Sequence, residues 1–251
     1  MLRNRIIPCL LLKENSLVKT VKFKNPNYIG DPINTVRIFN ELEVDELCFL
    51  DISATNQKRE PDYKILIEIC NECFMPLSYG GGINTFDTAK KILYLGFEKV
   101  VVNSLAYDNS KVITEISKHF GTQSIIGSMD VKRDFFGKQK VYTHGGINNT
   151  KFAPLEWALK LEDLGVGEIL LTSMDNEGTW KGLDLELIEK ISTKVHIPVI
   201  AHGGAGNIKD IKDAFQIGKA SAVALGSMVV FQQKGMGVLV NFPDKLILAE
   251  K

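Results

Sequence analysis

PLSYGGGINTFDTAKKILYLGFEKVVVNSL, residues 76–105, has a counterpart in PVIAHGGAGNIKDIKDAFQIGKASAVALGSM, residues 198–228. Aligning Gly81-Gly82 with Gly203-Gly204 gives an offset of about 122 residues, half of the 251-residue chain. The pair Glu46-Leu47 matches Glu168-Ile169 at that offset, and IIPCLLLK at 6–13 pairs with IIGSMDVK at 125–132. Self-similarity over half the chain predicts two tandem half-barrels.

Short apolar runs alternate with longer amphipathic stretches along the chain. The apolar runs are typical of parallel strands covered on both faces, at residues 6–12, 46–51, 76–79, 99–102, 124–130, 168–172, 198–201 and 222–225. The amphipathic stretches predict helices at 32–43, 62–72, 85–95, 110–119, 152–164, 184–192 and 208–217. Pro32 and Pro61 stand where helices should begin, and Gly96, Gly165 and Gly218 stand where helices should end.

This order of elements favours one closed barrel. Strands that alternate with helices in this number predict a (β/α)8 TIM barrel rather than an open sheet. The glycine runs do not match the G-x-G-x-x-G pattern of a dinucleotide-binding sheet. We expect a single domain over residues 1–251, with half-barrels at about 1–122 and 123–251.

Composition limits the classes of function. Hydrophobic residues make up 45% of the chain and charged residues 24%, the balance of a soluble globular protein. The 30 basic and 30 acidic residues cancel, which argues against a general nucleic-acid or membrane surface. Residues 1–5 do not begin a signal peptide, and no apolar run is long enough to span a bilayer. We expect a cytoplasmic protein with neither nucleic-acid nor membrane partners.

The four cysteines fit a reduced protein. Cys9 and Cys48 fall in apolar strand-like runs and are interpreted as buried small hydrophobes. Cys70 and Cys73 form a C-x-x-C, which could indicate metal or redox chemistry. They sit in an apolar helical run with no second Cys/His pair nearby, so a structural role is favoured. We expect neither a metal nor a cofactor.

Two pairs of motifs fall at the carboxyl ends of predicted strands, where barrel enzymes place their active sites. Glycine lets a phosphate approach backbone N–H groups, the next helix adds its dipole, and a serine hydroxyl can donate. The repeat therefore predicts one phosphate on each side of the mouth, and so a long, doubly anionic substrate. The first site is Gly81, Gly82, Asn103 and Ser104, and the second is Gly203, Gly204, Gly226 and Ser227, with Glu177 and Gly178 assisting.

Catalytic candidates come from other strand ends. Asp130 ends an apolar strand, where a carboxylate is costly unless it is used or paired. A catalytic role is favoured over a salt bridge to Lys132 or Arg133. Asp51 ends another strand, and direct chemistry and an orienting role are equally compatible with it. The repeat matches Asp130 with Leu11, so a facing pair of carboxylates lacks one member. His144 and His202 are the nearby residues that could substitute.

Four charged residues stand at strand starts, at the opposite end of the predicted barrel: Arg5, Glu46, Lys99 and Glu168. Such charges usually form solvated ion pairs. Alternating signs around one ring could also close, or gate, the barrel axis. The spacing does not separate the structural ring from the gate.

The sequence resembles HisF, the cyclase subunit of imidazole glycerol phosphate synthase, over nearly its whole length to about Phe231. The matching stretches are RIIPCLLLK (5–13), GDP (30–32), DELCFLDISA (45–54), GGGI (80–83), EKVVVNS (98–104), SMDVKR (128–133), GEILLTSMDNEGT (167–179) and IAHGGAG (200–206). In that family a HisH-type glutaminase docks on the bottom face, and its ammonia travels through the barrel to the substrate.

The resemblance implies roles for particular residues. Arg5, Glu46, Lys99 and Glu168 match the family's ammonia gate. Asp130 matches one of two catalytic aspartates, whereas the other maps to Leu11. Lys19 matches the lysine that the family keeps in its first loop. The implied partner is a HisH-like glutaminase in a heterodimer, and the implied activity is that of a lyase or cyclase-type subunit of a glutamine amidotransferase.

The chain departs from the family after Phe231, where QQKGMGVLVNFPDK replaces a long charged final helix. This ending resembles HisF-like paralogues of bacterial surface-glycan pathways such as lipopolysaccharide (O-antigen) biosynthesis. Those paralogues are associated with amidation of nucleotide-linked sugars, together with a glutaminase and a separate sugar amidotransferase. Leu11 and the tail favour this reading over histidine biosynthesis. A non-catalytic ammonia conduit remains as a third alternative.

Overall fold

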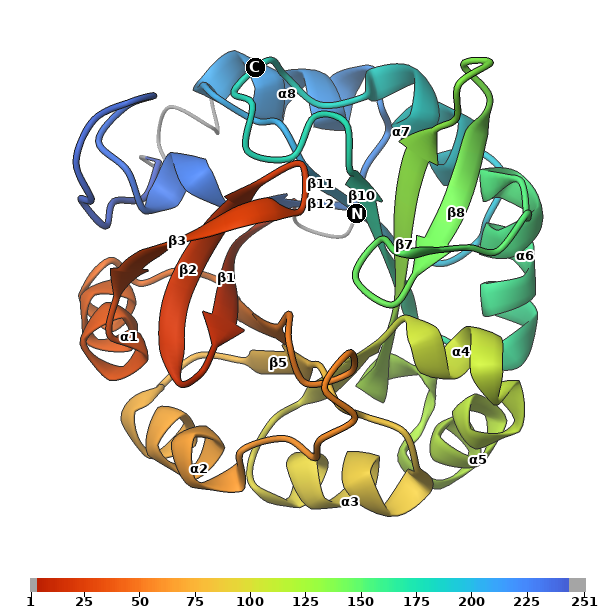
Figure 1. Ribbon diagram of the computed structural model, residues 1–251, viewed down its shortest axis with the longest axis horizontal. Coiled ribbons are helices and arrows are strands. Elements are labelled where there is room, and N and C mark those ends of the chain that lie inside the picture. The colour runs from red at the N-terminus through yellow and green to blue at the C-terminus, as the bar shows by residue number, and fades with distance from the viewer. Residues whose placement is uncertain (1–3, 244–251) are drawn as a thin grey trace.

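The computed structural model describes residues 4–243 and shows a (β/α)8 TIM barrel (Figure 1). The barrel strands are all parallel, and the pairing closes because β10 pairs with both β11 and β7. In order around the barrel they are β1 (Arg5–Lys13), β4 (Leu47–Asp51), β5 (Leu77–Gly80), β6 (Lys99–Val102), β7 (Ile125–Arg133), β10 (Glu168–Ser173), β11 (Val199–His202) and β12 (Ala222–Leu225). Each predicted strand is present, within a few residues of its predicted bounds.

Helices surround this barrel. They are α1 (Pro32–Glu41), α2 (Tyr63–Glu72), α3 (Phe86–Tyr94), α4 (Ser104–Asp108), α5 (Ser110–Phe120), α6 (Pro154–Leu164), α7 (Leu185–Ser192) and α8 (Ile208–Gln216). Local sequence explains their ends: Asp31 caps α1 by accepting from Asn34 N at 2.9 Å, with Pro32 in the first turn. Gly165 ends α6 in the left-handed conformation, as its position predicts.

The segment after β12 differs from the other units. It forms a short 3₁₀ turn, η2 (Ser227–Val229), and then a loop in which Phe231 bridges Val238. Between residues 226 and 243 the structure contains no α-helix, in keeping with the departure noted in the sequence. Asp244 and Lys245, which end the QQKGMGVLVNFPDK stretch, lie outside the described residues.

The core has two parts, as in other barrels of this kind. Apolar side chains between the sheet and the helices form the larger part. A smaller cluster fills the barrel interior from Ile7, Cys9, Cys48, Val101, Ile126, Leu170, Ile200, Ala222 and Ala224. Cys9 and Cys48 are buried partners in strand register, which confirms that they behave as small core residues.

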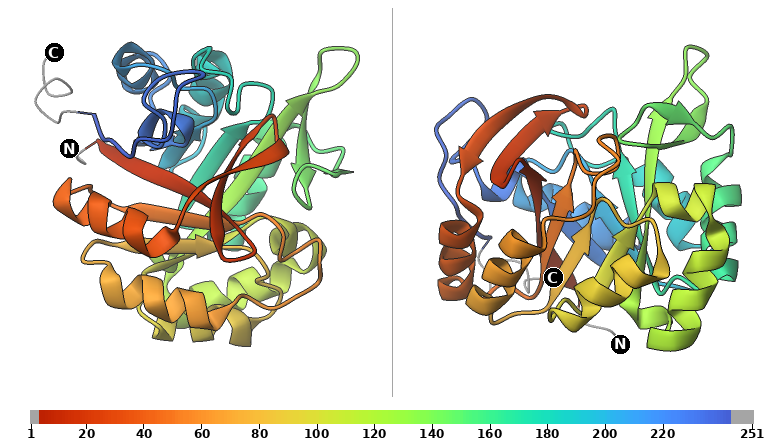
Figure 2. Two further views of the ribbon diagram at one scale, coloured as in Figure 1. Left: turned by 60° about the vertical axis from the view of Figure 1, so that its left-hand side comes forward. Right: turned by 60° about the horizontal axis from the view of Figure 1, so that its bottom comes forward.

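Sequence analysis missed two hairpins at the mouth. β2 (Ser16–Val21) and β3 (Lys24–Gly30) extend β1, while β8 (Gln139–Thr143) and β9 (Asn148–Asn149) extend β7. Figure 2 shows both on the same end of the barrel, with the β7–β8 hairpin projecting farther. The β1–β2 turn, Glu14 and Asn15, has positive φ at both residues without glycine, so the usual hairpin signal is absent.

Matched glycines make matched contacts in the two halves of the chain. A Cβ on Gly81 would lie 2.4 Å from Asp51 O, and a Cβ on Gly203 would lie 2.6 Å from Ser173 O. Gly81 and Gly203 are 122 positions apart, and so are Asp51 and Ser173. The same close approach of neighbouring strand ends therefore occurs twice, which supports the interpretation of two half-barrels.

Candidate functional site at the barrel mouth

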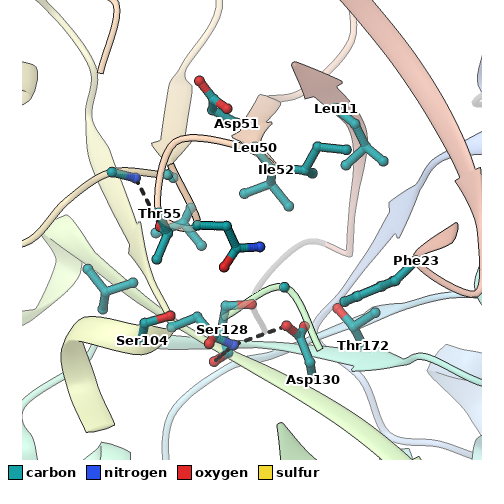
Figure 3. Close-up of a pocket in the computed structure, with 18 of the residues that line it drawn as sticks. Leu11, Phe23, Leu50, Asp51, Ile52, Thr55, Ser104, Ser128, Asp130 and Thr172 are labelled. Atoms are coloured by element: carbon teal, nitrogen blue, oxygen red, sulfur yellow. Dashed lines mark hydrogen bonds between the residues drawn. The ribbon is translucent and has the colours of Figure 1, made fainter. Parts of the chain in front are cut away.

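The carboxyl ends of the strands enclose a cavity of about 360 Å³ (Figure 3). Its walls are mixed: apolar side chains lie beside a few polar groups. The lining includes Leu11, Thr20, Phe23, Leu50, Asp51, Ile52, Gly81, Gly82, Asn103, Ser104, Ser128, Asp130, Ile147, Thr172, Glu177 and His202. A small number of convergent polar groups in an otherwise apolar pocket is typical of a small-molecule site.

The first predicted phosphate loop lines this cavity, since Gly81, Gly82, Asn103 and Ser104 all face it. Ser104 begins α4, and its Oγ accepts from His144 N at 3.1 Å. The amide of Asn103 donates to Asp130 Oδ2 at 3.1 Å. Within residues 4–243, the buried Asn103 Oδ1 finds no hydrogen-bond partner. This oxygen is therefore available to a donor on a ligand.

The second predicted loop lines a smaller adjoining hollow. Gly203, Gly204, Gly226 and Ser227 lie there with Glu177 and Gly178. A Cβ on Gly226 would lie 3.0 Å from Lys19 Nζ, so a cation adjoins this loop. The two predicted phosphate loops thus belong to separate but neighbouring hollows of one mouth, as the repeat predicts.

Glu177 lines both hollows and also holds the β2–β3 hairpin in place. Its carboxylate accepts from Thr20 Oγ1 at 2.9 Å and from Phe23 N at 3.0 Å. Its backbone oxygen accepts from Lys22 N. Glu177 therefore fastens the β2–β3 hairpin to the loop after β10. Gly178 packs beneath the same hairpin, because a Cβ there would lie 2.3 Å from Thr20 O.

Lys19 lies on β2 rather than in an irregular loop, and it is buried. Its Nζ donates to Cys9 O inside the mouth. Burial lowers the pKa of Lys19, while the nearby Cys9 and Glu177 act in the opposite direction. This residue places an amino group beside Gly226 of the second loop.

Asp130 is buried at the cavity wall and, among the described residues, forms no salt bridge with Lys132 or Arg133. Arg133 instead pairs with Asp184 at 3.3 Å. Burial raises the pKa of Asp130 to about 7, and the charge of His202 opposes the rise. A carboxyl group that titrates near neutrality is suited to proton transfer.

Leu11 and Asp130 line the same cavity, from β1 and β7 (Figure 3). Asp51 also lines it, but its oxygens are engaged in a turn. Oδ1 accepts from Ser53 N at 3.0 Å and from Ala54 N at 3.0 Å, and Oδ2 lies 2.6 Å from Arg59 Nη2. These contacts favour the orienting role for Asp51.

The structure separates the two candidate histidines. His144 directly follows β8 and pairs with Asp108 at 3.1 Å, outside the cavity lining. His202 ends β11, is buried, and lines both hollows. Its Nδ1 lies 3.1 Å from Thr172 Oγ1, a residue that sequence analysis did not select. The polar ending of the apolar run EILLTS is the signal that could have identified Thr172.

The opposite end of the barrel carries a closed ring of ion pairs. Arg5 lies 2.8 Å from Glu46 and 3.1 Å from Glu168. Lys99 lies 3.1 Å from Glu46 and 3.2 Å from Glu168. Glu46 directly precedes β4 and is almost fully buried. The predicted ring therefore exists, with each cation held between two carboxylates.

The remaining predicted features concern metal and membrane. Cys70 lies within α2, Cys73 ends it, and burial raises the pKa of Cys70 to about 11. Over residues 4–243, no cluster of His, Cys, Asp and Glu side chains is arranged to hold a metal ion. No helix in the same range is long and apolar enough to cross a membrane.

The chain matches a family of known proteins over most of its length. The family model described as "Histidine biosynthesis protein" matches residues 5–234. The chain belongs to the histidine biosynthesis protein family. This membership covers every barrel strand and both predicted phosphate loops.

Relatives in this family match nearly the full chain. "Putative imidazole glycerol phosphate synthase subunit hisF2" of Pseudomonas aeruginosa is 52% identical, over 97% of this chain and 97% of the relative. "Putative imidazole glycerol phosphate synthase subunit hisF3" of Vibrio vulnificus is 46% identical, over 97% and 94%. "Imidazole glycerol phosphate synthase subunit HisF" of Chlorobium phaeovibrioides is 42% identical, over 93% and 92%. The chain is thus a homologue of imidazole glycerol phosphate synthase HisF subunits.

Proposed function

We propose that this chain is the synthase-type subunit of a glutamine amidotransferase and receives ammonia from a HisH-like glutaminase. The glutaminase docks on the face that carries Arg5, Glu46, Lys99 and Glu168, and ammonia passes through the barrel to the mouth. There it reacts with a phosphate-containing substrate. The pathway is amidation of a nucleotide-linked sugar in surface-glycan biosynthesis, with a separate sugar amidotransferase as a further partner.

The bottom ring supports the docking face. Four alternating charges meet on the barrel axis, and Glu46 is almost fully buried there. Burying charges on an axis is costly unless they are paired, and paired charges can separate when a partner binds. Above the ring, the interior is lined by small or branched apolar side chains such as Cys9, Ala222 and Ala224. Such a lining disfavours ammonium and water relative to neutral ammonia.

The mouth supports a phosphate-containing substrate. Each hollow has a glycine turn and a serine, and Lys19 adds a cation beside Gly226. The unsatisfied Asn103 Oδ1 offers an acceptor for a substrate hydroxyl. A conduit that only delivers ammonia has no use for these groups.

Leu11 is the residue that favours the glycan pathway over histidine biosynthesis. It lies in the cavity on β1, where the repeat places the counterpart of Asp130, and cannot transfer a proton. Acid–base catalysis by one positioned group typically contributes ~10²–10⁴-fold. The relatives named as HisF subunits favour the second candidate, the cyclase of histidine biosynthesis. Leu11 weighs against that candidate.

A direct assay separates the candidates. The wild type and Leu11→Asp are each supplied with the cyclase substrate and ammonium salt, and imidazole glycerol phosphate is measured. We expect very weak turnover by the wild type and a gain of at least ~10²-fold in Leu11→Asp. The control is Leu239→Asp, because Leu239 is exposed. Leu12→Asp is not used, because Leu12 is buried in the core. Wild-type turnover at the level of an Asp-bearing HisF would overturn the glycan assignment.

A further inference from the structure

His202, Thr172 and Asp130 form one row across three neighbouring strands. Thr172 on β10 is the register partner of Asp130 on β7 and also of His202 on β11. All three side chains line the main cavity. Asp130 and His202 are each 8% exposed, so both are reachable from the cavity while largely withdrawn from bulk water.

We propose that His202 and Asp130 are the acid–base pair of this mouth, with Thr172 as the positioning residue between them. The inference rests on the proposed function, because it takes the mouth as the place where ammonia meets its substrate. It replaces the two facing carboxylates, of which Leu11 removes one, by a carboxylate on β7 and an imidazole on β11, with β10 between them.

Hydrogen-bond direction gives the tautomer of His202. Thr172 is the register neighbour of Asp130, and when Asp130 is ionised its carboxylate can only accept, so the Thr172 hydroxyl is the group that donates to it. The Thr172 oxygen then accepts from His202 Nδ1, 3.1 Å away. His202 therefore carries its fixed proton on Nδ1, and Nε2 is the nitrogen that exchanges a proton. A Cβ on Gly226 would lie 3.8 Å from Nε2, so this nitrogen faces the second phosphate loop.

Ionisable groups on three other segments affect the pKa of His202. Cys9 on β1 hydrogen-bonds it, Lys19 on β2 opposes its protonation, and Glu177 after β10 favours it. Burial is the largest influence and lowers the pKa of His202, but Cys9 and Glu177 raise it, and the net pKa lies above its ordinary value. Asp130 and His202 influence each other through charge. This arrangement favours protonation of the His202 imidazole beside a carboxyl group whose pKa is about 7.

The pair suits the condensation of ammonia with a carbonyl group. The ammonia nitrogen bonds to the carbonyl carbon as the C=O π bond breaks. The carbonyl oxygen takes the Nε2 proton of His202. The Asp130 carboxylate takes a proton from the added nitrogen. The Asp130 carboxylic acid then protonates the hydroxyl, the C–O bond breaks, and water leaves. His202 Nε2 takes a proton from nitrogen, which yields an imine and restores both groups. The substrate class is a phosphorylated carbonyl compound.

Nitrogen-15 NMR of ring-labelled histidine in the full chain tests the pair without any substrate. The chain has four histidines, and His202→Gln identifies the His202 resonances. We expect Nδ1 to stay protonated while Nε2 titrates, and Asp130→Asn to lower the pKa of His202. Thr172→Val should release the tautomer preference, and Thr172→Ser should restore it. His144→Gln is the matched control and should leave the His202 titration unchanged.

A neutral ring with its proton on Nε2 throughout pH 5–9, or a titration that ignores Asp130→Asn, would overturn the pair. That result would leave the proposed subunit role standing, because the titration involves neither glutaminase nor product. A different result is also informative: the His202 titration responds to Asp130→Asn, and the wild type shows the cyclase activity of the family. That result would support the pair but contradict the proposed glycan pathway. Any ammonium-dependent turnover by the wild type should fall by ~10²–10⁴-fold in His202→Gln. Unchanged turnover in that variant would also overturn the pair.

Discussion

Lys99 Nζ lies 3.2 Å from Glu168 Oε1, and this contact completes the ring of charges at the base of the barrel. The ammonium of Lys99 also lies 3.1 Å from Glu46 Oε1, so one cation holds two carboxylates of different strands together. Removing that cation would leave Glu46 and Glu168 facing each other with only Arg5 between them.

Reversal of this charge, Lys99→Glu, should open the ring because three carboxylates then repel one another. In the complex with a HisH-like glutaminase, we expect glutamine hydrolysis to continue while ammonia escapes to solvent. The measurement is free ammonia released per glutamate formed. Lys111→Glu, an exposed lysine of α5, is the charge-matched control. Equal ammonia retention by the wild type and Lys99→Glu would contradict a gate.

The two phosphate loops should each bind inorganic phosphate. We expect crystals grown in phosphate to show one anion at Gly82, Asn103 and Ser104, and another at Gly204, Gly226 and Ser227. Ser104→Ala and Ser227→Ala should each weaken one site about fivefold, the effect of losing a hydrogen bond of ~1 kcal/mol. Ser221→Ala, at the other end of β12, should change neither affinity. Empty loops at saturating phosphate would refute the doubly anionic substrate.

Asp130→Asn should stabilise the protein above neutral pH. The pKa of Asp130 is raised from 3.8 to about 7, so between these values the folded state binds more protons than the unfolded state. Stability contributed by the protonated carboxyl is therefore present at low pH and lost as pH rises through about 7. We expect Asp130→Asn to gain on the order of 2–4 kcal/mol at pH 8, since one pKa unit corresponds to ~1.4 kcal/mol.

Urea unfolding from pH 5 to pH 8 measures this difference. The gain should grow with pH and shrink toward pH 4. Asp87→Asn, in the first turn of α3 and exposed, is the control and should show little pH-dependent change. A constant difference between wild type and Asp130→Asn across that range would show that Asp130 is ionised throughout.

Gly204→Ala should destabilise the fold itself. The added methyl would lie 2.2 Å from Gly182 O, and Gly204 has a φ of +112°. Backbone must move to accommodate it, so we expect a loss of about 2–4 kcal/mol in the free energy of unfolding. Gly237→Ala, where nothing lies within 4 Å of the new methyl, should be close to neutral. A neutral Gly204→Ala would mean that this turn is held less tightly than the contact indicates.

Most of the barrel could be predicted from the sequence because its strands are short, apolar and evenly spaced. The repeat located both glycine turns, and the charges at strand starts located the ring. The β2–β3 hairpin could not be predicted, because the non-glycine residues Lys22 and Phe23 occupy its left-handed turn positions. The β8–β9 turn contains Gly145 and Gly146, but β9 is only two exposed asparagines and gives no strand pattern. Periodicity also could not foresee that Lys19 would turn inward from β2.

Individual residues of the site could be predicted from the sequence, but most contacts between them could not. Asp130 could be selected because a carboxylate at the end of an apolar run is costly. Its bond to Asn103 and its neighbour Thr172 depend on register between strands, which sequence spacing does not give. Glu177 shows the same limit: its position suggested a phosphate role, whereas its contacts with Thr20 and Phe23 depend on a hairpin from the other half of the chain.

The inward turn of β2 makes the second hollow a composite of both halves. Lys19, which adjoins Gly226, and Thr20, which holds Glu177, come from the N-terminal half, while the glycine turns come from the C-terminal half. A fragment comprising only residues 123–251 would retain those turns but lose their cation and their cover. Duplication of a half-barrel would copy the glycine turn without a cation beside it. Only the joining of the two copies would bring Lys19 to that turn. Assembly of the two halves would therefore determine the anion affinity that we propose for the second hollow.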